Sequence, residues 1–357
     1  FDPIPIPLVH EIDVSVGDAL SNLIININIF RRKYMINEKY KNELTNIKSV
    51  SNMREQFKEF CTSERTRLST GYLNLDFLLG GGITDELYVF GAPTSSGKTA
   101  FLMSIAQNLA KAGVYVLYFS LEMSCKEHIA RGTALISYET KIKGESMISY
   151  TTQDILSWRY NHDTEAFEKL QYSCYEPYVD EYFKRYGDKL HIIESGSNGL
   201  DAKRIANIAS EFRSIHLEEP FVVIVDYLQI VADSNNSDRK TSTDNMMSTF
   251  KNLSLNMEVP VICISSIGRE GYGKRIALDS FKESGNIEFG AGVCLGWSTV
   301  GENIKPYKED EALLSQYKRE GCRLIELDVL KSRNGEKGTS ARFKYNPAYN
   351  YFEELRD

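Results

Sequence analysis

Long apolar runs are missing from this 357-residue sequence, and the longest, such as Val114–Phe119, fall far short of the roughly 18 residues that span a membrane. No basic segment followed by an apolar core stands at the start, so no signal peptide is expected. The six cysteines include no C-x-x-C pair, and the five histidines show no ligand spacing. We therefore expect neither a zinc site nor a disulfide framework, and the cysteine pattern favours a reducing cytoplasm.

Positive charge is also scarce. Lys and Arg number 42 against 49 Asp and Glu, so the formal net charge is −7. This balance excludes a general basic coat for nucleic acid, and any such contact must be confined to a loop or a channel. What is present is a hydrophobic fraction of 42%, which is typical of a soluble globular protein with a sizeable core.

Two parts of the chain differ in character. Residues 1–64 begin with Pro3, Pro5 and Pro7 and continue into apolar residues at mixed helical spacing. The prolines indicate an extended start, and the rest indicates a short helical linker or docking segment. From residue 65 to residue 357 the patterns of strands and helices alternate. We therefore predict an N-terminal linker over 1–64 and one α/β domain over 65–357.

The strand patterns of the larger part are apolar on both faces. Strands are predicted at Glu86–Phe90, Val114–Phe119, His191–Ile193, Phe221–Val225 and Val259–Ser265, and helices at Lys98–Ala110, at Asp201–Ile215 and over much of 125–190. Buried strands that alternate with helices are typical of a mostly parallel sheet. Three shorter strands are predicted at 323–331, 341–345 and 349–352, and Asn334-Gly335 indicates a hairpin turn between the first two.

A glycine- and serine-rich loop joins the first predicted strand to the first predicted helix. Residues 92–99, APTSSGKT, match the phosphate-binding loop G-x-x-x-x-G-K-[ST] except that Ala92 stands at the first Gly. Backbone N–H groups at such a helix start bind a phosphate, Lys98 would neutralise the β- and γ-phosphate oxygens, and Thr99 would ligate magnesium. The predicted nucleotide-binding residues are Pro93, Thr94, Ser95, Ser96, Gly97, Lys98, Thr99 and Ala100.

Two carboxylates follow buried strand patterns. Asp226 ends the run Val222–Val225 at the carboxyl edge of the sheet, where it would complete the magnesium site with Thr99. Glu122 follows the strand at 114–119 and is a candidate to orient the attacking water. From the residues alone an alternative stays open, in which Glu122 begins a helix that Ser120 caps.

Further motifs follow the phosphate-binding loop in a fixed order: SLEM at 120–123, IVDYLQ at 224–229, SSIGR at 265–269, KESGNIE at 282–288 and LKSRNG at 330–335. Together they resemble the motor domain of DnaB-type replicative DNA helicases, in particular the shorter forms of phages and mobile elements, over residues 65–354. The resemblance implies a RecA-like P-loop NTPase with C-terminal β-hairpins that hydrolyses ATP with Mg²⁺. It also implies a hexameric ring on single-stranded DNA, with a helicase loader or a primase as a further partner.

The same resemblance assigns roles to three more residues. Lys331 and Arg333 would reach the nucleotide of the neighbouring subunit, where a cation stabilises the transition state. Ser266 would contact the nucleotide where the family commonly has a Gln that senses the γ-phosphate, so the coupling of hydrolysis to DNA is expected to be altered here. Without the resemblance, Lys331 and Arg333 indicate only a solvent-exposed hairpin.

Residues 266–282 hold four basic and two acidic side chains, a net charge of +2 in an acidic protein. We predict that they bind single-stranded DNA in the channel of the ring, with Tyr272 stacking on a base. The basic residues concerned are Arg269, Lys274, Arg275 and Lys282. An ordinary mobile surface loop is the alternative. The polar run 232–244 is predicted as a second loop of the channel.

Two other functions stay open. A RecA-, RadA- or KaiC-like ATPase of recombination or regulation would share the phosphate-binding loop, and the glycines at 80–82 suit it equally. A nucleotide-binding assembly module without turnover is kept open by Ser266 and by Gly290 and Gly292, which stand where acidic residues are common in the family. The stretches at 282–288 and 331–335 favour the helicase.

Overall fold

The computed structural model of the chain describes residues 50–55, 57–58, 67–157, 165–195, 199–217, 219–231, 239–268, 271–282, 284–302, 304–308, 310–333, 338 and 340–356. The chain divides into two compact units, Phe1–Glu64 and Arg65–Asp357. In the first unit the described part begins with the 3-10 helix η1 (Val50–Met53), and the helical linker expected before it lies outside the described residues. Every other element below belongs to the second unit.

A nine-stranded sheet in the order β3-β2-β4-β5-β1-β6-β7-β8-β9 forms the centre of the second unit. The strands from β3 to β6 in this order run parallel, and β7, β8 and β9 continue the sheet antiparallel. The strands are β1 (Leu87–Ala92), β2 (Tyr115–Ser120), β3 (Leu190–Glu194), β4 (Phe221–Asp226), β5 (Val261–Ser266), β6 (Val293–Thr299), β7 (Arg323–Ser332), β8 (Ser340–Asn346) and β9 (Tyr351–Leu355).

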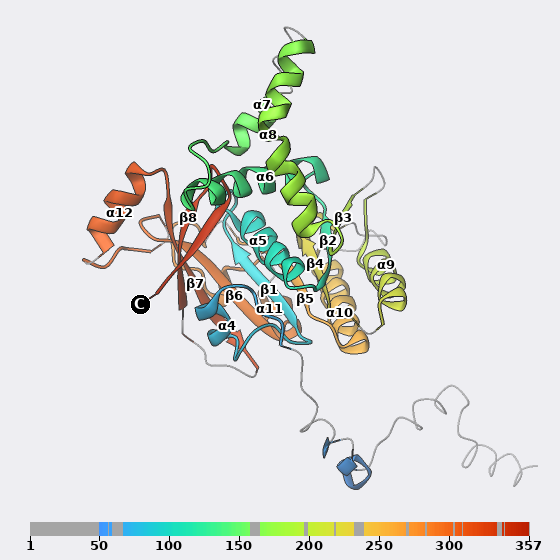
Figure 1. Ribbon diagram of the computed structural model, residues 1–357. Coiled ribbons are helices and arrows are strands. Elements are labelled where there is room, and N and C mark those ends of the chain that lie inside the picture. Colours follow the sequence, from blue (N-terminus) through green and yellow to red (C-terminus); the bar gives the residue numbers. More distant parts are fainter. Residues whose placement is uncertain are drawn as a thin grey trace, which may run out of the picture. The chain divides into compact units, whose positions relative to one another are not determined.

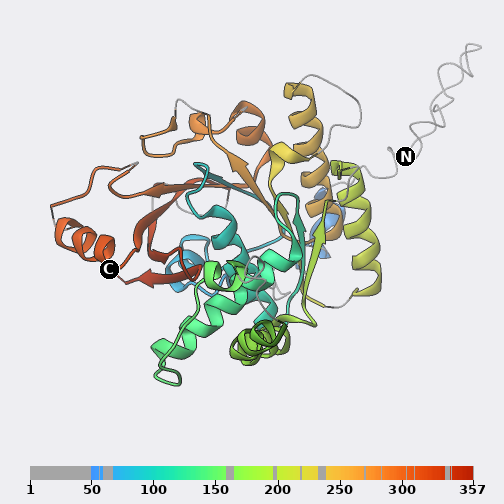
Figure 2. The same cartoon turned by 90° about the horizontal axis from the view of Figure 1, so that it is seen from above.

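Helices cover both faces of this sheet, as Figures 1 and 2 show. They are α4 (Leu73–Leu78), α5 (Lys98–Lys111), α6 (Cys125–Ile142), α7 (Thr152–Ser157), α8 (Glu165–Tyr186), α9 (Ala202–Ile215), α10 (Arg239–Met257), α11 (Ser284–Gly290) and α12 (Asp310–Arg319), with the 3-10 turns η3 (Leu228–Ile230) and η5 (Leu278–Ser280). Helices α5, α6 and α8 pack on one face, and α9 and α10 pack on the other.

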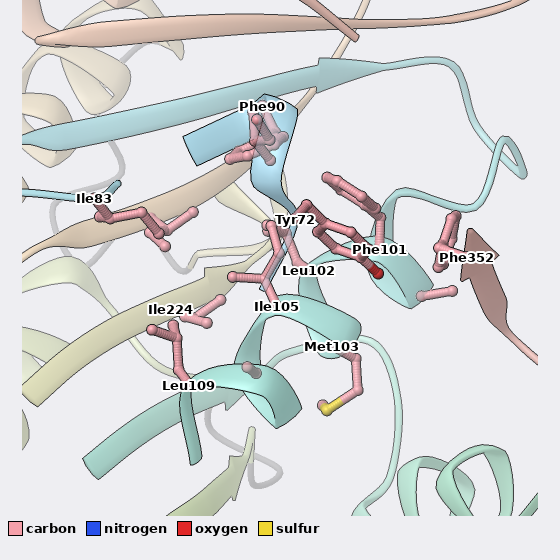
Figure 3. Close-up of a cluster of buried hydrophobic side chains, with 14 of the residues drawn as sticks. Tyr72, Ile83, Phe90, Phe101, Leu102, Met103, Ile105, Leu109, Ile224 and Phe352 are labelled. Carbon is pink, nitrogen blue, oxygen red and sulfur yellow. The ribbon is translucent and has the colours of Figure 1, made fainter. Parts of the chain in front are cut away.

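Side chains of the parallel strands alternate between two hydrophobic cores, because successive residues of a strand point to opposite faces. Tyr118 and Ile224 belong to the core under α5, whereas Phe119 and Val225 belong to the core under α9 and α10. Figure 3 shows part of the first core, with Phe101 of α5, Phe90 of β1 and Phe352 of β9. Trp297 of β6 and Phe343 of β8 also pack on the ring of Phe101. Burial on both faces explains why these strands read as continuous apolar runs.

The predicted mostly parallel sheet with C-terminal antiparallel strands is confirmed. Strand β6 was not predicted, and the predicted turn at Asn334-Gly335 lies outside the described residues. The prediction of a channel loop over 232–244 is wrong for residues 239–244, which begin α10, while 232–238 lie outside the described residues. Met246, Met247 and Phe250 bury one side of this helix, and the polar residues before them continue it. Among the described helices, none has the length and hydrophobicity to cross a membrane.

Candidate functional site

The loop between β1 and α5 is closed by hydrogen bonds to its own carbonyl groups. The Ser96 hydroxyl donates to the carbonyl of Pro93 at 2.8 Å. The Trp297 indole donates to the carbonyl of Ser96, and the Arg323 guanidinium donates to that of Ser95, both at 3.1 Å. With the loop carbonyls held by these donors, its N–H groups lie at the start of α5, where the helix dipole favours an anion.

Gly97 of the loop is constrained both by its backbone conformation and by a neighbouring side chain. Its φ of 98° lies in the left-handed region. A Cβ added there would lie 2.6 Å from Cε1 of Tyr345, which is itself buried and stacked on Phe352. Gly97 is therefore required both by its own backbone and by its neighbour in β8.

A cavity of about 480 Å³ opens above this loop, large enough for a nucleotide. The residues predicted for the nucleotide site that line it are Thr94, Ser95, Gly97, Lys98, Thr99, Ala100, Glu122 and Ser266. Pro93 and Ser96 instead shape the loop from behind, through their mutual hydrogen bond. The motifs at 120–123 and 224–229 thus meet the phosphate-binding loop at one edge of the sheet.

Lys98 projects from the first turn of α5 toward the two predicted carboxylates. Burial lowers the pKa of Lys98, and the charges of Asp226 and Glu122 oppose that shift. Its Nζ lies 5.3 Å from the ring centre of Tyr227, which follows Asp226. A cation placed in this way gains from the approach of anionic phosphate oxygens.

Asp226 lies at the end of β4 and is only 2% exposed. Burial raises its pKa, while the hydroxyls of Tyr118 and Thr99 and the charge of Lys98 lower it. The Tyr118 hydroxyl donates to Oδ2 at 2.8 Å, whereas Oδ1 is buried without a hydrogen-bond partner among the described residues. A buried oxygen of this kind calls for a further partner, and Asp226 beside Thr99 fits a magnesium ion with its waters.

Glu122 is exposed in the wall of the cavity, on the turn that follows β2. The Ser120 hydroxyl closes this turn by donating to the carbonyl of Met123 at 2.6 Å, and it also lies 2.8 Å from Nε2 of His128. Helix α6 begins only at Cys125, with Ser124 as N-cap in a capping box with Glu127. The alternative in which Ser120 caps a helix that starts at Glu122 is therefore wrong.

Ser266 ends β5 with its hydroxyl buried and without a hydrogen-bond partner among the described residues. The amide of Gln229 holds this strand end: its carbonyl oxygen accepts from the backbone N–H of Ser266 at 3.0 Å, and its NH₂ donates to the Ser265 hydroxyl at 2.9 Å. Gln229 thereby ties the turn after β4 to the end of β5. The Ser266 hydroxyl is available to a ligand in the cavity.

Sequence reasoning missed several residues of the cavity wall. Arg131 of α6 and Tyr227 line it, as do Thr152, Tyr345 and Asn350, which belong to distant parts of the chain. The spacing from the N-cap Ser124 to Arg131, two helical turns, was the available signal for the arginine. Thr152 and Asn350 gave none, because they meet only where the β8–β9 turn packs on the start of α7.

The four predicted DNA-binding residues do not form one group. Arg269 lies outside the described residues, and Lys274 is exposed. Lys282 lines the nucleotide cavity instead of a separate surface. Arg275 pairs with two carboxylates of β7, Asp328 at 3.0 Å and Glu326. Tyr272, the predicted stacking residue, lies 3.2 Å from Thr94, hydroxyl to hydroxyl.

Lys331 and Arg333 lie at the other end of the parallel strands from the phosphate-binding loop. Lys331 pairs with Cys294 of β6, which in turn lies level with Val89 in the body of β1. The Lys331 ammonium donates to the carbonyls of Ala291, at 2.6 Å, and Glu288. Burial lowers the pKa of Lys331. Arg333 is exposed just beyond the end of β7.

The mostly parallel sheet, the loop that opens α5 and the carboxylates at neighbouring strand ends place the chain in the P-loop fold class. Within that class the chain belongs to the DnaB-like helicase C-terminal domain family, which matches residues 67–354. The resemblance that the motifs indicated is thereby confirmed.

Two curated relatives are similar over most of the chain. The replicative DNA helicase DnaB of Geobacillus stearothermophilus is 27% identical over 301 residues, which cover 82% of this chain and 57% of the relative. The replicative DNA helicase DnaC of Bacillus subtilis (strain 168) is 26% identical over 297 residues, which cover 81% of this chain and 57% of the relative. The chain thus spans a little over half the length of the curated relatives it matches.

Solved structures show the same fold. The structure of a DnaB-like replicative helicase and its interactions with primase matches with a TM-score of 0.64 and 20% identity, over 95% of this chain and 75% of that one. A solved ATPase domain matches with a TM-score of 0.65 and 21% identity, over 87% of this chain and all of that one. The RecA-like fold predicted from the motifs is confirmed.

Proposed function

We propose that this chain is the motor of an ATP-dependent DNA helicase of the DnaB type, which hydrolyses ATP with magnesium and moves along single-stranded DNA. Membership of the family supports this proposal. The single observation that carries it is one edge of the sheet, where Lys98 and Glu122 line the cavity and Asp226 lies buried near both, with an oxygen that has no hydrogen-bond partner among the described residues.

The residues predicted at this edge of the sheet each have a role in the proposed reaction. The N–H groups of residues 94–99 bind the phosphates, and Lys98 neutralises the oxygens at the bond that breaks. Thr99 and Asp226 hold magnesium, which supplies positive charge to the phosphate oxygens. Glu122, exposed on a turn fixed by Ser120, orients the water for in-line attack on the γ-phosphate. Ser266 contacts the same phosphate through its hydroxyl, which no described residue engages in a hydrogen bond.

Lys331 and Arg333 would act on the neighbouring subunit. Ser332 pairs with Val293, which lies level with Tyr88, four residues before the end of β1. Arg333 is one residue further back, so it lies about 16 Å from the chain's own phosphate-binding loop along the strand direction. That separation argues against a role in its own site and supports a finger delivered to the next copy in a ring, which we take to be hexameric.

Other partners follow from the same proposal. Exposed Lys274 would contact the phosphates of single-stranded DNA, together with Arg269. Residues 1–64 would dock on an adjacent subunit as a linker, with residues 65–357 as the motor domain. A helicase loader or a primase would act on the assembled ring, and the whole reaction would take place in the cytoplasm.

A regulatory or recombination ATPase of the RecA, RadA or KaiC kind is the second candidate, because its cavity would look the same. ATP turnover measured with and without single-stranded DNA tests the proposal, with Lys98→Ala as the blank. We expect turnover that DNA stimulates and that the variant lacks, followed by strand separation on a forked duplex. Turnover that ignores DNA would favour the second candidate, and no turnover would favour a nucleotide-binding assembly module.

A further inference from the structure

The segment 271–282, between β5 and α11, is anchored on the strand that leads into the phosphate-binding loop. The backbone N–H of Gly268 donates to the carbonyl of Ser280 at 2.8 Å, and Ile267 and Phe281 form an isolated antiparallel bridge. Phe281 is 3% exposed and packs on Gly91, where an added Cβ would lie 2.4 Å from the ring. The base of the segment therefore has a fixed position relative to β1.

One side of the segment reaches the nucleotide cavity. Tyr272 places its hydroxyl 3.2 Å from that of Thr94, the second residue of the loop after β1. The hydrogen bond with Thr94, with help from the charges of Lys282 and Lys98, lowers the pKa of Tyr272. The segment is thus in direct contact with the phosphate-binding loop.

The other side of the segment contacts β7. Arg275 makes salt bridges with Glu326 and Asp328, whose side chains are only 6% and 8% exposed. These carboxylates are two residues apart and so share one face of the strand, where one guanidinium can pair with both. Ile276, the next residue, is buried, and its N–H donates to the Ser298 hydroxyl of β6 at 3.1 Å.

The two salt bridges of Arg275 lie just before an irregularity in the pairing of β7 with β6. Val329 pairs with Leu295 and Lys331 with Cys294, so Leu330 is an extra residue in the ladder. Such a bulge bends a strand and changes the direction of the residues beyond it, which here are Lys331 and Arg333. Arg275 fixes the strand on the near side of the bulge, and the bonds of the Lys331 ammonium fix it on the far side.

We propose that the segment 271–282 is a brace that sets the position of the proposed trans finger. Arg275 is in this view a positioning residue for β7 rather than a contact for DNA phosphates, and Tyr272 links the same segment to the chain's own phosphate-binding loop. Nucleotide bound in one subunit would thereby change the position of its Arg333, which reaches the nucleotide of the neighbouring subunit. This inference rests on the proposed function, and it assigns Arg275 a role other than the one that charge alone suggests.

The test compares Arg275→Gln with Arg342→Gln. Both remove a salt bridge to a nearly buried carboxylate. Arg342 lies in β8 next to β7, but its side chain pairs with Asp310 of α12, whereas the side chain of Arg275 pairs with two carboxylates of β7 itself. We expect Arg275→Gln to lower the kcat of ATP hydrolysis without DNA by about tenfold or more, because a small misplacement of a catalytic group slows the reaction strongly. The affinities for ATP and for single-stranded DNA should stay unchanged. Arg342→Gln should keep kcat per folded molecule. If the variant instead binds DNA more weakly, and the slope of log K against log salt concentration falls in magnitude by about 1, Arg275 is a phosphate contact and the proposal is overturned.

A second variant tests whether the two sides of the brace act together. Tyr272→Phe removes only the hydroxyl, and we expect a smaller loss of kcat that adds nothing to Arg275→Gln in the double variant. Losses that multiply would show independent roles and overturn the brace. Hydrogen exchange of the β7 amides at 329–333 gives a readout without turnover: it should rise in Arg275→Gln and stay unchanged in Arg342→Gln. If the wild type hydrolyses no ATP, the proposed function fails while this exchange still decides the brace.

Discussion

At the scale of single residues, the edge of the sheet beside the cavity holds two charged groups, Asp226 and Lys98, whose burial disfavours their ionised forms. Burial raises the pKa of Asp226 and lowers the pKa of Lys98, and each charge favours the ionised form of the other. Asp226 is not fully compensated by the described part of the protein, because its Oδ1 has no hydrogen-bond partner there. Such a site gains stability when phosphate and a divalent cation bind together.

His128 offers a residue-scale test because it is fully buried behind the turn of Glu122. Burial, with the charge of Arg131, lowers the pKa of His128 to about 4. The folded protein therefore prefers the neutral ring, and the unfolded chain takes up the proton first as pH falls. We expect this residue to remove up to about 3 kcal/mol from the free energy of unfolding between roughly pH 7 and pH 4.

Urea unfolding at several pH values measures this effect. His128→Gln keeps a hydrogen-bonding group beside Ser120 without a titrating ring. The free energy of unfolding of this variant should depend less on pH than that of the wild type over the same range. Parallel pH profiles for the two proteins would contradict the assignment of the neutral, buried ring.

At the scale of elements, strand β6 shows why one strand of the sheet was not predicted from the sequence. A Cβ added at its Gly296 would lie 2.8 Å from Cδ1 of Leu330 in β7, and the buried hydroxyl of its Ser298 accepts a hydrogen bond from the N–H of Ile276. Glycine and polar residues in a strand hide the apolar run by which buried strands are recognised. The run from Phe221 to Val225 has neither and was predicted from its residues alone.

The junction of β1 and α5 permits a matched comparison of two glycines. Gly97 and Gly113 flank α5 with φ of 98° and 88°, but only Gly97 has a neighbour, Tyr345, that a Cβ would strike. We expect Gly113→Ala to lower stability by about 1–2 kcal/mol through backbone strain, with nucleotide binding kept. Gly97→Ala should lose more stability and bind nucleotide at least about tenfold more weakly, since the clash displaces the loop.

Thermal unfolding and titration with a fluorescent ATP analogue measure both quantities on the same samples. The comparison separates strain from displacement, because both variants bear the same left-handed backbone. Equal nucleotide affinity in the two variants would show that the loop tolerates a side chain at Gly97.

At the scale of the whole molecule, the two halves of the proposed catalytic machinery lie at opposite ends of the parallel strands of one sheet. The cavity stands at the carboxyl ends of the parallel strands, and Arg333 follows β7 at the other end. A single copy cannot bring them together. The proposed site is complete only between two copies that repeat head to tail, as a ring provides.

Mixing two inactive variants tests this arrangement. Lys98→Ala removes the phosphate cation but keeps the finger, and Arg333→Ala removes the finger but keeps the cavity. Each should hydrolyse ATP poorly, and Arg333→Ala should still bind nucleotide. In mixed rings about a quarter of the sites would receive both groups, so turnover should reappear toward that fraction of the wild-type rate. Wild-type turnover by Arg333→Ala alone, or no recovery on mixing, would contradict a finger in trans.

The sequence by itself determined the fold class, the phosphate-binding loop and the strand ends with Glu122 and Asp226. These features are local: an apolar run, a helix start and a glycine pattern arise from neighbouring residues, so they can be read without a fold. The order of the motifs then indicated the family.

Only the tertiary structure decided what the charged residues of segment 271–282 contact. Arg275 and Lys274 are adjacent and equally basic in sequence, yet one grips Glu326 and Asp328 and the other faces solvent. Lys282, a predicted DNA contact, lies instead in the cavity, as does Asn350 of the distant β8–β9 turn. The reason is that a charge pairs with what the fold brings near it, and those partners come from strands about 50 or more residues away, beyond the reach of any local pattern.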